Sequence, residues 1–317
     1  MRKKWKRVIL FFVILAMLLA GCSVWIQSEA VKLSDFIPGR SRPFVSIAAE
    51  RKDSIDMVVL GDSESYTSVS PMQLWKEQGM AAYVCGQPGQ KIQETYYMLK
   101  TAFKYQSPKV VLMETNLMFR DPGPVKNLQV SLAEPARYHF PLLRFHNLWK
   151  LAFDGKKPGE PVYKGFAIRS KVDPFDSGDY MKETKEVQEM PKAVRFYMEE
   201  IQEMCRRNGA ELILMSAPSP KNYSYKKHNA IENYAKEKGI PYVDLNLQIR
   251  ELGIDWQEDS YDKGDHLNLY GAQKVTAWLG GYLKEKYEMP DHRNDPSYED
   301  WNQMEEKYEK EIQKVSL

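Results

Sequence analysis

Five short apolar runs alternate with amphipathic segments, and this alternation constrains the fold of the chain more than any other feature. The runs span residues 55–60, 82–85, 109–113, 211–216 and 241–245. Segments with helical spacing follow them, at roughly residues 72–78, 93–105, 191–208, 226–238 and 268–287. Apolar runs bounded by turn residues are typical of strands buried on both faces. Their alternation with helices predicts right-handed crossovers, and therefore an α/β fold: a three-layer sandwich with a mostly parallel central sheet.

Residues 120–190 break this rhythm with seven prolines and many aromatic side chains. We expect a long insertion there, within a domain that spans residues 53–289. We expect it to lie over the carboxyl edge of the sheet, where α/β proteins bind their ligands. Residues 290–317 are rich in Glu and Lys and predict a charged, solvated C-terminal helix.

The N-terminal residues form an export signal. Five basic residues between positions 2 and 7 precede the uncharged stretch Val8–Ile26, an order that keeps the N-terminus in the cytoplasm. We interpret residues 1–29 as a signal or membrane anchor and residues 30–52 as a linker.

The form of the anchor has two interpretations. Leu19-Ala20-Gly21-Cys22 resembles the lipobox of bacterial lipoproteins, in which the cysteine becomes the lipidated N-terminus. Alternatively, Cys22 is an ordinary thiol in an uncleaved transmembrane helix, because the stretch is just long enough to span a bilayer. Both predict that the domain is held at the cell membrane, on its extracytoplasmic side.

Composition argues against several classes of function. The 45 basic and 43 acidic residues nearly balance, so no nucleic-acid partner is expected. The five histidines show no HExxH or paired spacing, and we predict neither a metal site nor another cofactor. Cys85 and Cys205 lack a motif, and we expect two separate buried thiols.

Gly61-Asp62-Ser63 directly follows the first apolar run and is the first chemical signal. A serine at the carboxyl end of a central strand points into the ligand crevice, and the turn exposes its backbone N–H. The same triplet is also an ordinary way to begin a helix, because Asp and Ser are preferred N-cap residues.

The second signal is the segment from Tyr261 to Asn268, immediately before the last predicted helix. It contains His266 with carboxylates nearby, which fits a general base held in one tautomer by an acid. An exposed polar loop that ends in an Asn cap would have the same composition. The two segments would meet at one edge of a doubly wound sheet.

Together these segments resemble the SGNH, or GDSL-like, hydrolase superfamily over roughly residues 55–283. In that family a Gly-Asp-Ser block carries the nucleophile and an Asp-x-x-His block carries the base, which implies Ser63 and His266 here. A glycine and an asparagine from the middle blocks complete the oxyanion hole with the serine amide. The matching residues are Gly89, after the second run, and Asn116, after the third.

Two departures from the family pattern concern the acid and the third block. The position three residues before His266 is Lys263, which cannot orient an imidazole. Asp262 is the preferred acid if the turn is one residue longer, and Asp265 is the alternative. The third block is Glu-Thr-Asn-Leu rather than Gly-x-Asn-Asp, so Glu114 is a candidate structural carboxylate.

The resemblance implies acyl transfer through a serine ester. Its membrane-anchored branch, which includes DltD-like proteins and polysaccharide O-acyl esterases, suggests an acyl ester of cell-envelope polysaccharide or teichoic acid as substrate. That branch works beside a membrane-bound O-acyltransferase, which is the partner expected here. Hydrolysis and transfer both stay open. The alternative is a catalytically inactive envelope scaffold or glycan-binding partner of such an acyltransferase.

Overall fold

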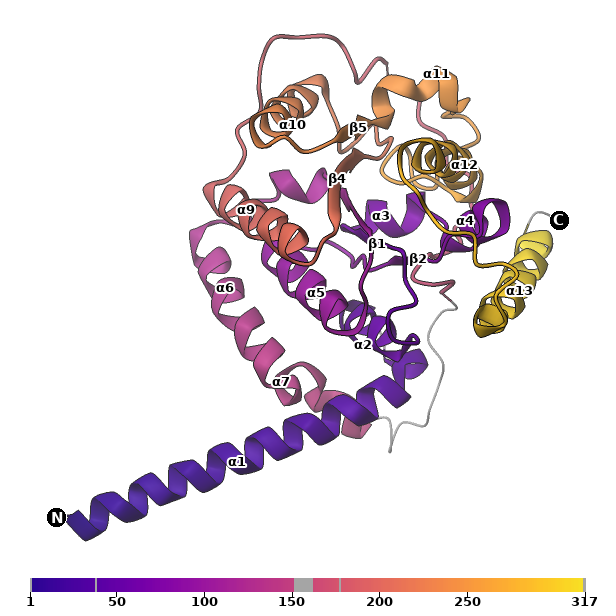
Figure 1. Ribbon diagram of the computed structural model, residues 1–317. Helices are drawn as coiled ribbons and strands as arrows, with labels where there is room; N and C mark the ends of the chain where they lie inside the picture. Colours follow the sequence, from indigo (N-terminus) through magenta and orange to yellow (C-terminus); the bar gives the residue numbers. More distant parts are fainter. Residues whose placement is uncertain (1, 38, 151–161, 177, 316–317) are drawn as a thin grey trace.

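The five predicted apolar runs form one parallel sheet (Figure 1). A computed structural model describes residues 2–37, 39–150, 162–176 and 178–315. The strands are β1 (Met57–Leu60), β2 (Ala82–Val84), β3 (Val110–Glu114), β4 (Glu211–Ser216) and β5 (Tyr242–Asp244). Their order is β2-β1-β3-β4-β5, and every neighbouring pair is parallel. The predicted α/β sandwich with a parallel central sheet is confirmed, with a flavodoxin-like strand order.

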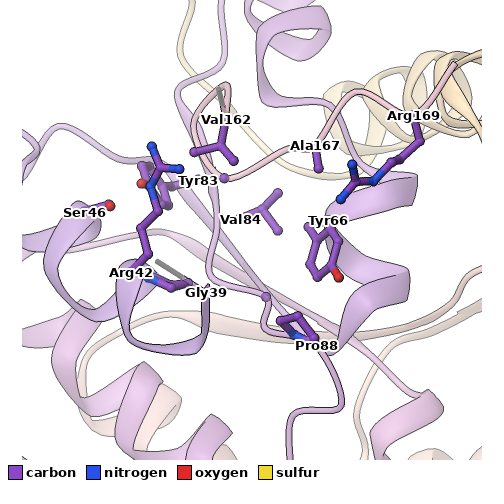
Figure 2. A pocket seen from close by; sticks show the side chains of 13 residues that line it. Gly39, Arg42, Ser46, Tyr66, Tyr83, Val84, Pro88, Val162, Ala167 and Arg169 are labelled. Carbon is purple, nitrogen blue, oxygen red and sulfur yellow. The ribbon is translucent and has the colours of Figure 1, made fainter. Parts of the chain in front are cut away.

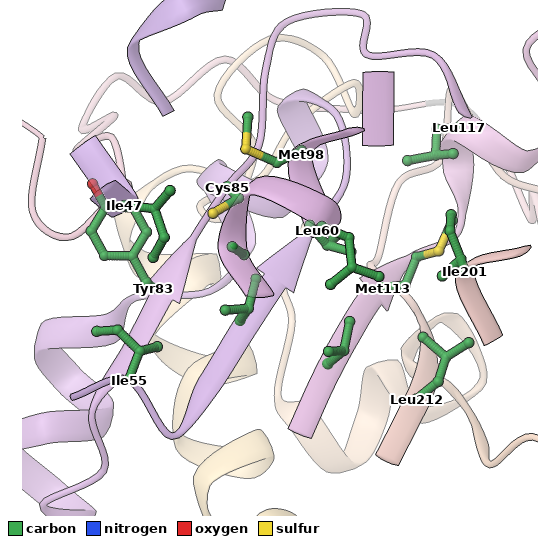
Figure 3. Close-up of a cluster of buried hydrophobic side chains, with 14 of the residues drawn as sticks. Ile47, Ile55, Leu60, Tyr83, Cys85, Met98, Met113, Leu117, Ile201 and Leu212 are labelled. Atoms are coloured by element: carbon green, nitrogen blue, oxygen red, sulfur yellow. The ribbon is translucent and has the colours of Figure 1, made fainter. Parts of the chain in front are cut away.

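Side chains that alternate along each strand enter two separate cores. Val58 and Leu60 of β1 belong to the cluster beneath α2 (Arg42–Ala49), α5 (Ile92–Tyr105) and α9 (Lys192–Arg207), part of which Figure 3 shows. Met57 and Val59 face the opposite core, which α12 (Leu269–Lys286) and Leu74 of α4 (Pro71–Gln78) cover. Two-sided burial explains why the strands are continuously apolar in the sequence.

The segment predicted as a linker, residues 30–52, is instead part of the folded domain. It contains the end of α1 (Arg2–Lys32), two short 3₁₀ helices, η1 (Ser34–Phe36) and η2 (Gly39–Ser41), and α2. Phe44, Val45 and Ile47 of α2 are buried. Pro43 suggests a loop in the sequence, but proline is well tolerated in the first turn of a helix.

Helix α1 continues without a break through Gly21 and Cys22. Within the described part of the chain, the single helix long and apolar enough to cross a membrane is Lys4–Lys32, judged by length and composition. The mean hydropathy of its most apolar window is 2.7. Cys22 is exposed on this helix.

The predicted insertion divides into two parts. Its first half forms α6 (Pro124–His139), α7 (Pro141–Phe145) and η4 (His146–Trp149). Helix α6 packs on α5, and α7 packs on α1. Residues 151–161 lie outside the described part. Residues 163–169 do follow the edge, since the Ala167 N–H donates to the Tyr66 carbonyl and the Leu269 N–H donates to the Arg169 carbonyl.

The C-terminal helix is packed rather than fully solvated. After η6 (Pro296–Tyr298), helix α13 (Glu299–Val315) lies against α4. Trp301 and Tyr308 are buried, and the Tyr308 hydroxyl lies 2.8 Å from the Ser70 hydroxyl. Their spacing of one heptad places both on one helix face, while the Glu and Lys side chains cover the others.

Cys85 and Cys205 are free and buried, in agreement with their interpretation as separate thiols. Burial raises the pKa of both, that of Cys205 to about 12, so neither is a reactive thiolate at neutral pH.

Candidate active site

The candidate site lies at the topological switch point of the sheet, where β1 is flanked by β2 and β3. The chain leaves β1 at Gly61 and enters α3 (Ser63–Ser68), and it leaves β3 just before Asn116. Gly89 lies in the loop that follows β2. All three strands run in one direction, so their carboxyl ends form one edge, as expected for a ligand crevice.

Ser63 is the first residue of α3, and its position is fixed from both sides. Asp62 is the N-cap, and its Oδ1 accepts a hydrogen bond from the Glu64 N–H at 3.1 Å. A Cβ atom at Gly61 would lie 2.7 Å from the Cβ of Ser65 and 2.8 Å from that of Glu114. Only glycine fits this tight approach. The nearby Ser65 is buried and donates to the Asp62 carbonyl at 2.8 Å.

His266 bridges Ser63 and Asp262. Its Nε2 lies 2.8 Å from Ser63 Oγ, across 203 residues of sequence, and its Nδ1 lies 2.8 Å from Asp262 Oδ2. The other Asp262 oxygen accepts the His266 backbone N–H at 2.7 Å. With Nδ1 protonated, Nε2 accepts the hydroxyl hydrogen of Ser63, which is the arrangement a general base requires.

The longer turn that Asp262 requires is present. Lys263 and Gly264 both adopt left-handed backbone conformations, with φ of 59° and 81°. The Gly264 N–H donates to the Ser260 hydroxyl at 2.7 Å, and the Tyr261 N–H donates to the His266 carbonyl at 3.0 Å. This turn brings a carboxylate four residues before the histidine back to its ring.

The alternative acid, Asp265, is held by a different partner. Its Oδ1 lies 3.7 Å from His266 Nδ1 but accepts a hydrogen bond from Asn222 Nδ2 at 2.5 Å. The same Asn222 nitrogen lies 2.8 Å from Glu64 Oε1. Asn222 therefore joins the histidine loop to the first turn of the serine helix. No local sequence pattern marks Asn222, so its place at the site could not be predicted.

Asn116 contacts a buried carboxylate beside the serine. Its Nδ2 donates to Asp62 Oδ2 at 3.1 Å, and Arg120 Nε donates to the same oxygen at 2.8 Å. Asn116 Nδ2 carries a second hydrogen. The predicted oxyanion hole of Ser63, Gly89 and Asn116 thus has its three members at one edge, and its role stays a prediction.

Two further carboxyl groups, those of Glu64 and Glu114, are buried next to Asp62. Burial, with neighbouring carboxylates, raises the pKa of Glu64 well above its usual range and that of Glu114 to about 8. Burial also lowers the pKa of Lys227, whose Nζ lies 3.5 Å from Asn116 Oδ1. Glu114 accepts the Asn116 backbone N–H, a structural role consistent with its interpretation as a supporting carboxylate.

A cavity of about 370 Å³ adjoins the serine helix (Figure 2). Tyr66, one turn after Ser63, faces it. Gly86 lines it and lies close to the serine loop. A Cβ atom at Gly86 would lie 2.2 Å from Ser65 Oγ, so the glycine permits this close approach. Arg42 and Arg169 border an otherwise largely apolar lining.

In the described part of the chain, one group brings three potential metal ligands within 4.8 Å of one another: Asp262, Asp265 and His266. Both ring nitrogens of His266 already have partners, Ser63 and Asp262. The hydrogen-bonded arrangement therefore suits proton transfer without an added ion.

Arg120, the first residue of the insertion, reaches Asp62 beside Ser63, but other charged residues of the insertion are held elsewhere. Arg144 pairs with the buried Glu134 at 2.6 Å and lies over the ring of Phe44. Lys171 pairs with Asp173 on the surface. Arg169 is the exception, since it borders the cavity.

No family model and no curated protein matches the chain. The solved structures to which it is similar include a GDSL-like lipase from Bacteroides thetaiotaomicron and a lipase/acylhydrolase from Enterococcus faecalis. The first is 12% identical with a TM-score of 0.41, and the alignment covers 78% of this chain and 97% of the lipase. The second is 12% identical with a TM-score of 0.38, with coverages of 74% and 99%.

Proposed function

We propose that this chain is a serine-dependent ester hydrolase or O-acyltransferase. One observation carries the proposal: Ser63 Oγ, His266 and Asp262 form a continuous hydrogen-bonded relay with both contacts at 2.8 Å. Ser63 and His266 come from opposite ends of the domain sequence. Neither the contact between them nor the contact of His266 with Asp262 joins one strand or helix to the next. A relay of hydroxyl, imidazole and carboxylate is the arrangement that activates a serine nucleophile.

The reaction proceeds in two halves. Ser63 Oγ attacks the ester carbonyl carbon while its proton moves to His266 Nε2. The bond from that carbon to the alcohol oxygen then breaks, and the alcohol leaves with the proton from His266. In the second half, water or a hydroxyl group gives a proton to His266 Nε2 while its oxygen attacks the acyl carbon. The bond from that carbon to Ser63 Oγ then breaks, Ser63 Oγ takes the proton back from His266, and a carboxylic acid or a new ester leaves. Asp262 holds Nδ1 and stabilises the imidazolium that forms in each half.

The negative oxygen of each tetrahedral intermediate needs fixed donors. The backbone amides of Ser63 and Gly89 and the side chain of Asn116 are the proposed donors. The bond from Asn116 to the buried Asp62 supports this role, because it limits how the amide group can rotate.

We propose an acyl ester of cell-envelope polysaccharide or teichoic acid as the substrate, with the domain outside the cytoplasmic membrane. The apolar helix α1 supports the location. The cavity beside α3 supports an acyl ester as the substrate class, because its largely apolar lining suits an acyl group. A membrane-bound O-acyltransferase is the proposed partner.

A fluorophosphonate probe tests the chemistry without knowledge of the substrate. We expect the full chain, solubilised with α1 intact, to be labelled at Ser63 and the Ser63→Ala variant to stay unlabelled. A matched control is Ser65→Ala, which removes a neighbouring hydroxyl that bonds to the Asp62 carbonyl. Equal labelling of wild type and Ser63→Ala would refute the proposal and favour the inactive scaffold.

A further inference from the structure

The exposed part of α1 has the dimensions of a bilayer. Its apolar side chains are exposed from Trp5 to Trp25, and these two tryptophans are 67% and 65% exposed. A helix of about 20 residues is about 30 Å long, the thickness of the hydrocarbon core. Tryptophan is enriched at both membrane interfaces, and Lys4, Lys6 and Arg7 lie at the cytoplasmic end. The outer interface therefore lies near Trp25.

The domain begins where this band ends. Ser23, Ile26 and Ala30 are buried, at a spacing that places them on one face of α1. Gln27 lines a small pocket together with Pro141 and Phe145 of α7. The apolar band and the residues of α1 that pack on the domain belong to one continuous helix, so no flexible segment lies between them. The helix thus fixes which side of the domain meets the membrane.

Helices α6 and α7 lie on that side. Figure 1 shows α7 against α1, and α6 along the flank of the domain toward which the N-terminal half of α1 projects. The large apolar side chains exposed on these elements form what we name the membrane-proximal patch: Val125, Leu128, Leu132, Phe140, Leu143 and Trp149.

The composition of the patch suits lipid. Val125, Leu128 and Leu132 recur at helical spacing on one face of α6, while the opposite face packs on α5. Lys126 and Lys150 flank the patch, and basic residues beside an apolar helix face favour anionic lipid headgroups.

We propose that the membrane-proximal patch lies in the outer interface of the phospholipid bilayer, so that the domain rests on the membrane through α6 and α7 as well as α1. This inference rests on the membrane anchor in the proposed function and not on the chemistry of Ser63. The patch is continuous with the α1–α7 contact, and that continuity argues for the bilayer as its occupant.

Fluorescent labels at single cysteines test the position of the patch. The full chain, in a Cys22→Ser background, is reconstituted into phosphatidylcholine–phosphatidylglycerol vesicles with or without brominated acyl chains. Leu132→Cys and Leu143→Cys carry an environment-sensitive label in the patch, where the native side chains are 67% and 50% exposed. The matched control is Leu247→Cys, 51% exposed on η5 (Leu245–Gln248). Cys85 and Cys205 are buried, with raised pKa values that keep them unlabelled.

We expect brominated lipid to quench the labels at 132 and 143 at least about twofold more than the label at 247. Leu18→Cys, within the exposed apolar band, reports the anchor itself. Quenching at 18 but not at 132 and 143 would overturn the inference and leave the anchor intact. Patch labels that become shielded only when other membrane proteins are added would overturn it too. Absence of quenching at 18 would refute the anchor and the inference together, while fluorophosphonate labelling of Ser63 would be unaffected.

Discussion

The two loops that meet at the candidate site are held in different ways. The loop of Ser63 is part of the core: Asp62, Glu64 and Ser65 are buried, and Gly61 packs against β3. The loop of His266 lies nearer the surface, and Asp262 is about one-third exposed. Hydrogen bonds within the loop and to Asp173, Ser219, Lys221 and Asn222 hold it, together with the close packing of Gly264 on the Phe175 ring. Changes at the buried carboxyl groups Asp62 and Glu64 therefore affect folding and chemistry together. Changes at the half-buried Ser63, His266 and Asp262 affect chemistry with little cost in stability.

The largest expected effect is the loss of either end of the relay. We expect Ser63→Ala and His266→Ala each to lower kcat for p-nitrophenyl acetate by about 10³- to 10⁶-fold, because the members of a triad act as a unit. Thermal unfolding of both variants should stay close to that of wild type, since each change only shortens a half-buried side chain. Wild-type turnover in either variant would contradict the assignment.

The acids in the histidine loop provide the next test. We expect Asp262→Asn to lower kcat by about 10²- to 10⁴-fold, because the amide no longer holds the productive tautomer of His266. Asp265→Asn, the matched control three residues along, should stay within about threefold of wild type, since its carboxylate bonds Asn222 instead. The opposite ranking would assign the orienting acid to Asp265.

The serine and histidine loops also differ in how well the sequence predicts them. Buried strands have a strong local signal, and parallel strands must end at one edge, so Ser63 and His266 could be paired across the whole domain. The choice between Asp262 and Asp265 depends on left-handed backbone at Lys263 and Gly264. Lysine rarely adopts this backbone conformation, so the sequence did not predict it. The spacing alone therefore could not decide whether Asp262 or Asp265 orients His266.

The regions that sequence misjudged have mixed composition. Prolines and polar residues around α2 suggested a linker, and the charges of α13 suggested full solvation. A helical apolar pattern was present in both, at Phe44 and Ile47 and at Trp301 and Tyr308, and could have revealed their packing. Asn222 is different, because its contacts to Glu64 and Asp265 are long-range hydrogen bonds that no periodicity predicts.

Asn222 links the two loops through its hydrogen bonds to Glu64 and Asp265. Its removal should have an intermediate effect on activity. We expect Asn222→Ala to lower kcat about tenfold, because Asp265 and the adjacent His266 lose a fixed position. The KM for substrate should change less than kcat, because Asn222 acts by positioning His266 and does not contact the substrate. The control is Asn229→Ala on α10 (Tyr225–Lys238), whose amide bonds the carbonyls of Thr184 and Glu186. Equal effects of the two variants would mean that Asn222 only supports the local fold.

Glu114→Gln should have the smallest effect on activity, within about threefold at pH 7, because the buried carboxyl is mostly protonated there and an amide of the same shape replaces it. Its effect on stability should depend on pH. Burial raises the pKa of Glu114 from 4.5 in an ordinary environment to about 8 in the folded chain, so the folded state binds this proton more tightly. Its contribution to the free energy of unfolding is fully present below pH 4.5 and is lost as pH rises through about 8.

Wild type should therefore lose more thermal stability between pH 5 and pH 8.5 than Glu114→Gln, in which no proton can be released at this position. The neighbouring Asp62, Glu64, Arg120 and Lys227 are common to both proteins, so the difference between the two melting curves reports Glu114 together with its effect on these neighbours. Parallel curves across this range would show that the carboxyl is ionised in the folded chain. A compensated buried charge at the end of β3 would then lie against the serine loop, and the attachment of that loop would be partly electrostatic rather than a consequence of burial alone.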